Sequence, residues 1–108
     1  MSLIQKTCIP CQGGMLALTI ADAGALMDQV PGWGLADAGD RLQRQFKFDD
    51  FVAALEFVNR LGALAEEEGH HPDISFGWGY ADVVFFTHKI KGLHENDFIM
   101  AAKTNALI

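Results

Sequence analysis

Residues 69–88, GHHPDISFGWGYADVVFFTH, decide the fold because they predict an antiparallel β-hairpin. Successive residues from 80 to 88 fall on opposite sides, with the period of two that is typical of a strand. The shorter segment 73–78 precedes this strand, and the glycines within 77–79 predict the bend between the two. One side of the longer strand carries Ala81, Val83, Phe85 and Thr87, and the other side carries Tyr80, Asp82, Val84, Phe86 and His88.

The residues before this hairpin predict two helices and a second hairpin. Residues 19–30 suit a short amphipathic helix that ends at a Pro-Gly pair. Residues 33–48 predict a hairpin that turns at 38–40 and continues as an alternating strand. Residues 50–68 form the longest predicted helix, which Asp49 or Asp50 can cap and Gly69 can end. Its expected apolar face comprises Phe51, Leu55, Val58, Leu61 and Ala65.

A last helix at about residues 95–107 completes the predicted order of helix, hairpin, helix, hairpin and helix. Short connections and antiparallel hairpins indicate an α+β domain, in which helices lie on one face of an antiparallel sheet. Residues 1–18 lack a clear period, so we expect an N-terminal tail that is at most partly ordered, followed by one domain at residues 19–108.

The composition excludes some classes of protein. The chain has 108 residues and a net charge of −6, from 8 Lys and Arg against 14 Asp and Glu. This acidic balance disfavours nucleic acid as a partner. No apolar run approaches the roughly 20 residues of a membrane span, and no basic-then-apolar leader opens the sequence. We therefore expect a cytoplasmic protein with no membrane partner.

The two cysteines, Cys8 and Cys11, lie close together in TCIPCQGG. A CxxC pair can be half of a zinc site or a redox couple. No second CxxC is present to complete a zinc site, and no strand precedes the pair as a thioredoxin-like motif requires. We therefore expect two reduced thiols in the tail.

The predicted hairpin also brings histidines together. It returns the end of the longer strand to the start of the shorter one, so His88 should approach His70 and His71. Pro72 favours extended backbone at the residue before it, and adjacent extended residues point in opposite directions. The two neighbouring imidazoles should therefore reach a ligand from different sides.

Three interpretations of this histidine cluster remain open. The histidines can lie on the surface beside a helix end without a function. They can hold a metal together with Glu66 or Asp97, although the spacing lacks the HxH or HxxxH pattern. They can also perform metal-free general acid–base catalysis, because imidazole gives and takes protons near neutrality.

The stretch from residue 66 to residue 98 resembles the pterin-4a-carbinolamine dehydratases, and the similarity extends over roughly residues 20–105. The family pattern has an acidic or polar residue, His-His-Pro, an aromatic residue, another histidine and an aspartate at fixed spacing. Here these are Glu66, His70, His71, Pro72, Trp78, His88 and Asp97. Many members have an aromatic residue where this chain has Ile74, so Phe86 or Trp78 would have to stack on a ligand instead.

The resemblance implies a four-stranded antiparallel sheet with three helices packed on one face, assembled as a homodimer or homotetramer. It implies dehydration of 4a-hydroxytetrahydropterin to quinonoid dihydropterin, without a metal or organic cofactor. That reaction recycles the pterin of an aromatic amino acid hydroxylase, which is a candidate partner. The alternatives are a non-enzymatic dimerisation cofactor for a transcription factor and a pterin-binding protein of molybdopterin metabolism.

The resemblance also assigns residues. It implies that His70 and His88 serve as acid and base, in an order left open, while His71 holds the ring. Asp97 should support the site or cap the last helix, and Glu66 should orient an imidazole. We expect Glu67 and Glu68 to be solvated and His94 to be exposed. The implied substrate-binding residues are Gly69, His70, His71, Phe86, Thr87, His88 and Lys89.

Overall fold

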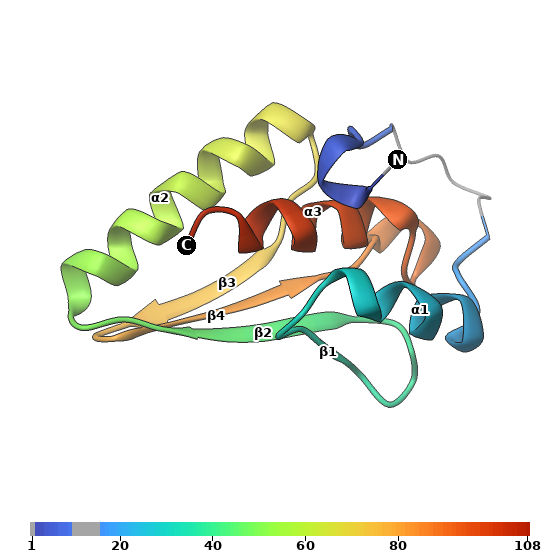
Figure 1. Ribbon diagram of the computed structural model, residues 1–108, viewed down its shortest axis with the longest axis horizontal. Helices are drawn as coiled ribbons and strands as arrows, with labels where there is room; N and C mark the ends of the chain where they lie inside the picture. The colour runs from blue at the N-terminus through green and yellow to red at the C-terminus, as the bar shows by residue number, and fades with distance from the viewer. Residues whose placement is uncertain (1, 10–15) are drawn as a thin grey trace.

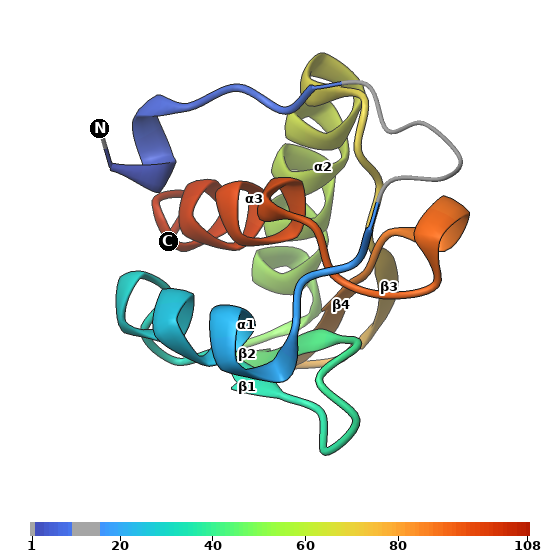
Figure 2. The same cartoon turned by 90° about the vertical axis from the view of Figure 1, so that its right-hand side faces the viewer.

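The structure is a computed structural model that describes residues 2–9 and 16–108. Four antiparallel strands form one sheet with the spatial order β1-β2-β4-β3, and α2 and α3 lie over the same face of it (Figures 1 and 2). The predicted α+β architecture, with a four-stranded antiparallel sheet and three helices, is therefore confirmed. The boundary expected at residues 18 and 19 stays a prediction.

Both predicted hairpins are present, and left-handed glycines allow their turns. Strand β1 pairs with β2, and Gly39 in the loop between them has φ 70°. Strand β3 pairs with β4, and Gly79 in their turn has φ 81°, which glycine adopts at no steric cost. The strands are β1 Gly34–Leu35, β2 Leu42–Lys47, β3 Asp73–Gly77 and β4 Tyr80–Phe85. The helices are α1 Ile20–Leu26, α2 Phe51–Glu68 and α3 Glu95–Asn105, with 3₁₀ turns η1 Leu3–Gln5, η2 Met27–Gln29 and η3 His88–Ile90.

The core lies between the helices and one face of the sheet. One of the two sides predicted for the longer strand is buried, and its members are Ala81, Val83, Phe85 and Thr87. Trp33 packs edge-on against Phe46, and its indole N–H donates to Oδ1 of Asn105 at 2.8 Å. Aromatic packing and a satisfied indole donor thus tie the first hairpin to α3.

Helix α2 begins and ends as predicted, but its buried face differs from the prediction. The Asp50 carboxylate accepts the Ala53 N–H at 2.8 Å, and Gly69 ends the helix at φ 67°. The buried residues are Ala54, Phe57, Leu61 and Ala65. The expected members Phe51 and Leu55 are exposed. Apolar side chains lie on more than one face of this helix, and the face that carries Phe57 packs against Phe46 and Phe48 instead.

Strand β4 is shorter than predicted and ends at Phe85 rather than His88. Thr87 instead forms an isolated antiparallel bridge with Gly92, and its N–H donates to the Gly92 carbonyl at 2.8 Å. Closing this loop takes Lys91 into left-handed backbone at φ 53°. His88 consequently lies in a 3₁₀ turn rather than in a strand.

His94 is half-buried, and the expectation that it is exposed was wrong. It is the N-cap of α3, and its Nδ1 accepts the Asn96 N–H at 3.0 Å. The Asp97 carboxylate accepts the His94 N–H at 2.9 Å in return, which completes a capping box. Imidazole therefore replaces the hydroxyl that usually fills this position. Helix α3 ends at Asn105, shorter than the predicted limit at residue 107.

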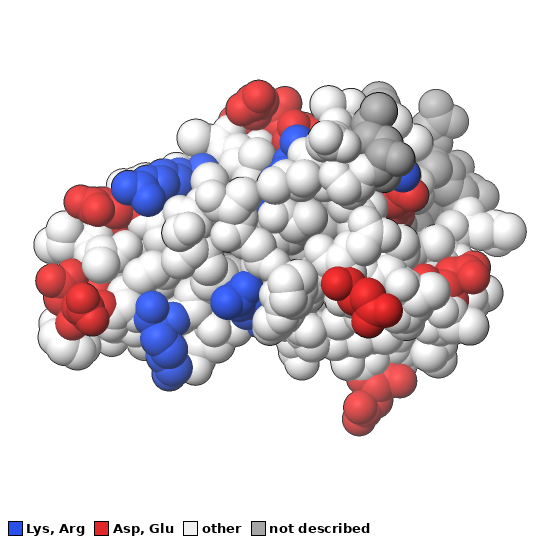
Figure 3. All heavy atoms as spheres, in the orientation of Figure 1, with Lys and Arg blue, Asp and Glu red and all other residues white. Residues whose placement is uncertain are grey.

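The surface carries charges of both signs. On the face shown in Figure 3, Lys and Arg side chains lie apart from one another, interspersed with acidic groups. Over residues 2–9 and 16–108, no helix combines the length and the apolar character that crossing a bilayer requires.

Candidate active site

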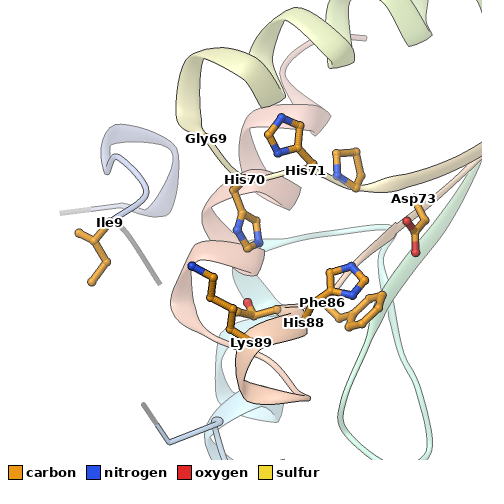
Figure 4. Close-up of a pocket in the computed structure, with 10 residues that line it drawn as sticks. Ile9, Gly69, His70, His71, Asp73, Phe86, His88 and Lys89 are labelled. Carbon is orange, nitrogen blue, oxygen red and sulfur yellow. The ribbon is translucent and has the colours of Figure 1, made fainter. Parts of the chain in front are cut away.

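A cavity of about 460 Å³ opens where α2 leads into β3 and β4 leads into η3 (Figure 4). Its size is within the range of about 300–1,000 Å³ that is usual for small-molecule sites. All of the predicted substrate-binding residues line it. They come from the start of the first strand and the end of the second strand of the β3–β4 hairpin, which lie side by side opposite its turn. The lining consists of Ile9, Gly69, His70, His71, Pro72, Asp73, Phe86, Thr87, His88 and Lys89.

His70 is held by a buried carboxylate. Its Nε2 lies 2.6 Å from Oδ1 of Asp97, whose side chain has no exposed surface. Oδ2 of Asp97 accepts from the Thr87 hydroxyl at 2.7 Å and from the His94 N–H at 2.9 Å. Because the carboxylate accepts, this pattern assigns the Nε2 proton to His70 and leaves Nδ1 as the nitrogen that can serve a ligand. Asp97 thus both caps α3 and contacts an imidazole of the cavity.

His71 forms a second contact between an imidazole and a carboxylate, through its Nε2 and Oε2 of Glu66. The left-handed turn at Gly69 directs the chain back past the last turn of α2, where Glu66 lies. Both side chains are largely exposed, 59% for His71 and 79% for Glu66, so the pair adds little to stability. Its structural effect is to fix the direction of the ring. It also places an imidazole beside an acidic group at a helix end that disfavours anions.

His88 differs from the other two because it packs on an aromatic ring. Its ring centroid lies 3.9 Å from that of Phe86, with the planes tilted by 47°. The Arg41 guanidinium lies over the same Phe86 ring at 4.9 Å. The cavity therefore has two imidazoles oriented by carboxylates and a third supported by a phenyl group. Among the described residues, no three His, Cys, Asp or Glu side chains are arranged to hold a metal.

Other predicted residues lie elsewhere. Trp78 is 72% exposed in the turn at the far end of the hairpin, so Phe86, and not Trp78, is the aromatic residue of the cavity. The expectation that Glu68 is solvated was wrong: its side chain is 8% exposed and pairs with Lys103 at 3.7 Å. The reason is that residues 6–9 lie over this end of α2, where Glu68 accepts the Cys8 N–H at 2.9 Å.

Cys8 is half-buried beside this carboxylate, and Cys11 lies outside the described residues. Burial, and then the negative charges of Glu68 and Asp97, raise the pKa of the Cys8 thiol from 9.0 to about 12. Its thiol therefore stays protonated near neutrality, and it donates to the Asn96 carbonyl at 3.8 Å.

One residue that the sequence did not indicate also lines the cavity. Ile9 comes from the segment that was expected to be a tail. Its neighbour in space, Asn96, is 87 positions away in the chain, so no local pattern relates the two.

Comparison with known proteins gives consistent matches. Residues 17–107 match the family described as pterin 4 alpha carbinolamine dehydratase. A protein of Azoarcus sp. (strain BH72) is 59% identical over 97% of this chain and 90% of its own length. A protein of Methylococcus capsulatus (strain Bath) is 57% identical over 98% of this chain and 93% of its own. Both carry the name pterin-4-alpha-carbinolamine dehydratase as a provisional assignment.

Two solved structures share the fold. One is described as a transcriptional coactivator/pterin dehydratase from Brucella melitensis, and it superposes with a TM-score of 0.79 at 33% identity. That match covers 84% of this chain and 97% of the other. The second, a pterin dehydratase-like protein described as a RuBisCO assembly factor of the α-carboxysome, gives a TM-score of 0.62 at 28% identity over 73% of this chain and 92% of its own.

Proposed function

The chain belongs to the pterin-4a-carbinolamine dehydratase family, and from this membership we propose that it dehydrates 4a-hydroxytetrahydropterin to quinonoid dihydropterin by histidine acid–base catalysis. The observation that supports this most strongly is the convergence of three imidazoles on one cavity, from both ends of the β3–β4 hairpin. Aromatic and backbone groups beside them suit a flat heterocycle that forms hydrogen bonds along its edge.

The reaction needs two proton transfers. A base removes the proton from N5, the N5–C4a bond becomes double, and the C4a–O bond breaks. An acid delivers a proton to the departing hydroxyl, which leaves as water. The substrate thus gives one proton to the base and takes one from the acid. Each positioned imidazole typically contributes about 10²–10⁴-fold to such a step.

We assign the base to His70. Asp97 accepts the Nε2 proton at 2.6 Å, so the positive charge that forms when Nδ1 takes the N5 proton lies beside a buried carboxylate. Such a carboxylate fixes the tautomer and stabilises the imidazolium. His88 then supplies the proton to the hydroxyl, and His71, oriented by Glu66, positions the ring.

The test is a stopped-flow measurement of 4a-hydroxytetrahydropterin decay, with the substrate generated by an aromatic amino acid hydroxylase. We expect the protein to accelerate decay over buffer, and His70→Ala and His88→Ala each to lose most of that acceleration while remaining folded. His94→Ser is the matched control, because it removes the histidine that does not line the cavity and leaves a hydroxyl to cap α3. Equal losses in all three variants would contradict the assignment.

We further propose that the protein acts in the cytoplasm, recycles the pterin of such a hydroxylase, and forms a homo-oligomer. Exposed apolar side chains at one end of the molecule support an oligomer: Phe51, Val52, Leu55 and Trp78. Phe51 stacks on Phe76 at 5.8 Å, which places the start of α2 beside the β3–β4 end of the sheet. Light scattering should give a mass above that of the 11.8 kDa chain, and a monomer at micromolar concentration would contradict this proposal.

A regulatory role is the second candidate, because the two proteins of known structure are described as a coactivator and as an assembly factor. A His70→Ala/His88→Ala double variant separates the two roles in a strain whose growth requires the protein and from which the native protein has been deleted. If the wild type restores growth and the double variant does not, the result supports catalysis. Full restoration supports a role that does not require the imidazoles.

A further inference from the structure

We propose that the N-terminal segment 6–9 is a fixed wall of the substrate cavity, in which Ile9 contacts the bound pterin and Asn96 is the positioning residue. This proposal rests on the proposed function and extends it to the recognition of the substrate. The segment precedes residues 17–107, which are the part of the chain that matches the family.

The backbone of Ile9 is clamped by one buried side chain. Oδ1 of Asn96 accepts the Ile9 N–H at 3.1 Å, and Nδ2 donates to the Ile9 carbonyl at 2.7 Å. Asn96 is 1% exposed, so its side-chain amide is shielded from water and its two polar groups are satisfied by Ile9. The side-chain amide of Asn96 thus pairs with both the N–H and the C=O of Ile9, as a residue of a neighbouring antiparallel strand would.

Further contacts hold the rest of the segment. Lys6 pairs with Glu95 at 3.1 Å, and Glu68 accepts the Cys8 N–H at 2.9 Å. All of these anchors lie in the last turn of α2 or the first turn of α3. Gly69 follows that turn of α2, and Asp97, which holds His70, belongs to that turn of α3. The wall and the proposed catalytic base therefore share one rigid support.

Ile9 presents apolar surface to the cavity. It lines the cavity and is 54% exposed, and Figure 4 shows it across the site from Asp73, with His70 between them. A bound ring that covers this surface gains the free energy of apolar burial. The gain is the same in the ground state and the transition state, because Ile9 offers no group to the reacting atoms. The contact should therefore affect KM and leave kcat unchanged.

Ile9→Ala tests the contact, and Ile4→Ala is the matched control. Ile4 lies just before this segment, in η1, and is 45% exposed, but it lines a different cavity. We expect Ile9→Ala to raise KM roughly tenfold, the lower end of what small changes in apolar contact produce. The value of kcat should stay within about twofold, and Ile4→Ala should match the wild type. Equal KM values for the two variants would overturn the proposal.

Asn96→Ala tests the positioning role. It should raise KM as Ile9→Ala does, and the double variant should be no worse than Ile9→Ala, because both changes remove one contact. Additive effects in folded protein would show that Asn96 acts on the site by another route and would overturn its assignment.

Titration calorimetry with 7,8-dihydrobiopterin separates this inference from the proposed function, because binding needs no turnover. A roughly tenfold weaker Kd for Ile9→Ala, with no dehydration by the wild type, would support the wall and refute the dehydratase. Dehydration with an unchanged Kd and KM would refute the wall alone. No binding and no turnover by the wild type would refute both.

Discussion

Replacing Asp97 by Asn should abolish most activity while preserving the fold. In the native protein, Oδ2 of Asp97 accepts from Thr87 at 2.7 Å and from His94 at 2.9 Å, and Oδ1 faces Nε2 of His70 at 2.6 Å. An amide oxygen directed to the two donors keeps both bonds. The amide nitrogen must then donate to Nε2, so the proton of His70 moves to Nδ1. The imidazole would present a donor to the cavity where the reaction needs an acceptor.

The size of each effect follows from these contacts. Hydrogen bonds to a charged acceptor contribute about 1.5–3 kcal/mol each, and bonds between neutral groups about 0.5–1.5 kcal/mol. Asp97→Asn keeps two bonds but weakens both, so it should lower the free energy of unfolding by about 2 kcal/mol. Asp97→Ala, which leaves buried donors without an acceptor, should cost about 3–5 kcal/mol. The loss in kcat for Asp97→Asn should be about 10²–10⁴-fold, which is the usual contribution of one positioned acid–base group.

Denaturant unfolding and stopped-flow kinetics on the same Asp97→Asn sample provide the assay. A ¹⁵N spectrum of the labelled imidazoles reports whether the tautomer of His70 has changed. A folded variant with a kcat close to that of the wild type would show that the carboxylate serves only to cap α3 and does not orient His70 for catalysis.

Three further outcomes are expected. Glu66→Gln should change the free energy of unfolding by less than about 0.5 kcal/mol, because its pair with His71 is exposed, but calorimetry should show weaker pterin binding. Gly69→Ala should destabilise the fold by about 1–2 kcal/mol in denaturant unfolding, because φ 67° is costly for a residue with Cβ. Cys8, in a Cys11→Ser background, should react with iodoacetamide at pH 8 far more slowly than in the unfolded chain, because its pKa is raised to about 12. The stability that depends on this protonated thiol is complete below the ordinary pKa of 9.0 and is lost as the pH rises towards the folded value of about 12.

The sequence predicted those parts of the fold that depend on local signals. Alternation in β4, the Asp50 cap and the left-handed Gly69 each act over a few residues, and the structure has all three. The buried face of α2 was predicted only in part: Leu61 and Ala65 are buried, but Phe51 and Leu55 are not. Phe57 is buried instead because it packs against Phe46 and Phe48, a contact that the helical period does not encode.

The sequence indicated the histidines of the cavity and two carboxylates beside them, Asp97 and Glu66, but not the contribution of the N-terminal segment. Periodicity and the hairpin bring His88 near His70, and the structure has both imidazoles on one cavity. The wall at Ile9 depends on Asn96, 87 positions away, and such a contact leaves no local pattern. The cap at His94 was missed because imidazole seldom fills that position, so the usual residue preferences pointed elsewhere.

Histidine-catalysed dehydration is tested most directly by the first-order decay of 4a-hydroxytetrahydropterin with wild-type protein and with the His70→Ala/His88→Ala double variant. We expect the wild type to accelerate decay in proportion to its concentration and the folded double variant not to. Decay at the buffer rate with the wild type would rule out dehydration by this protein, and equal acceleration by the double variant would rule out catalysis by His70 and His88.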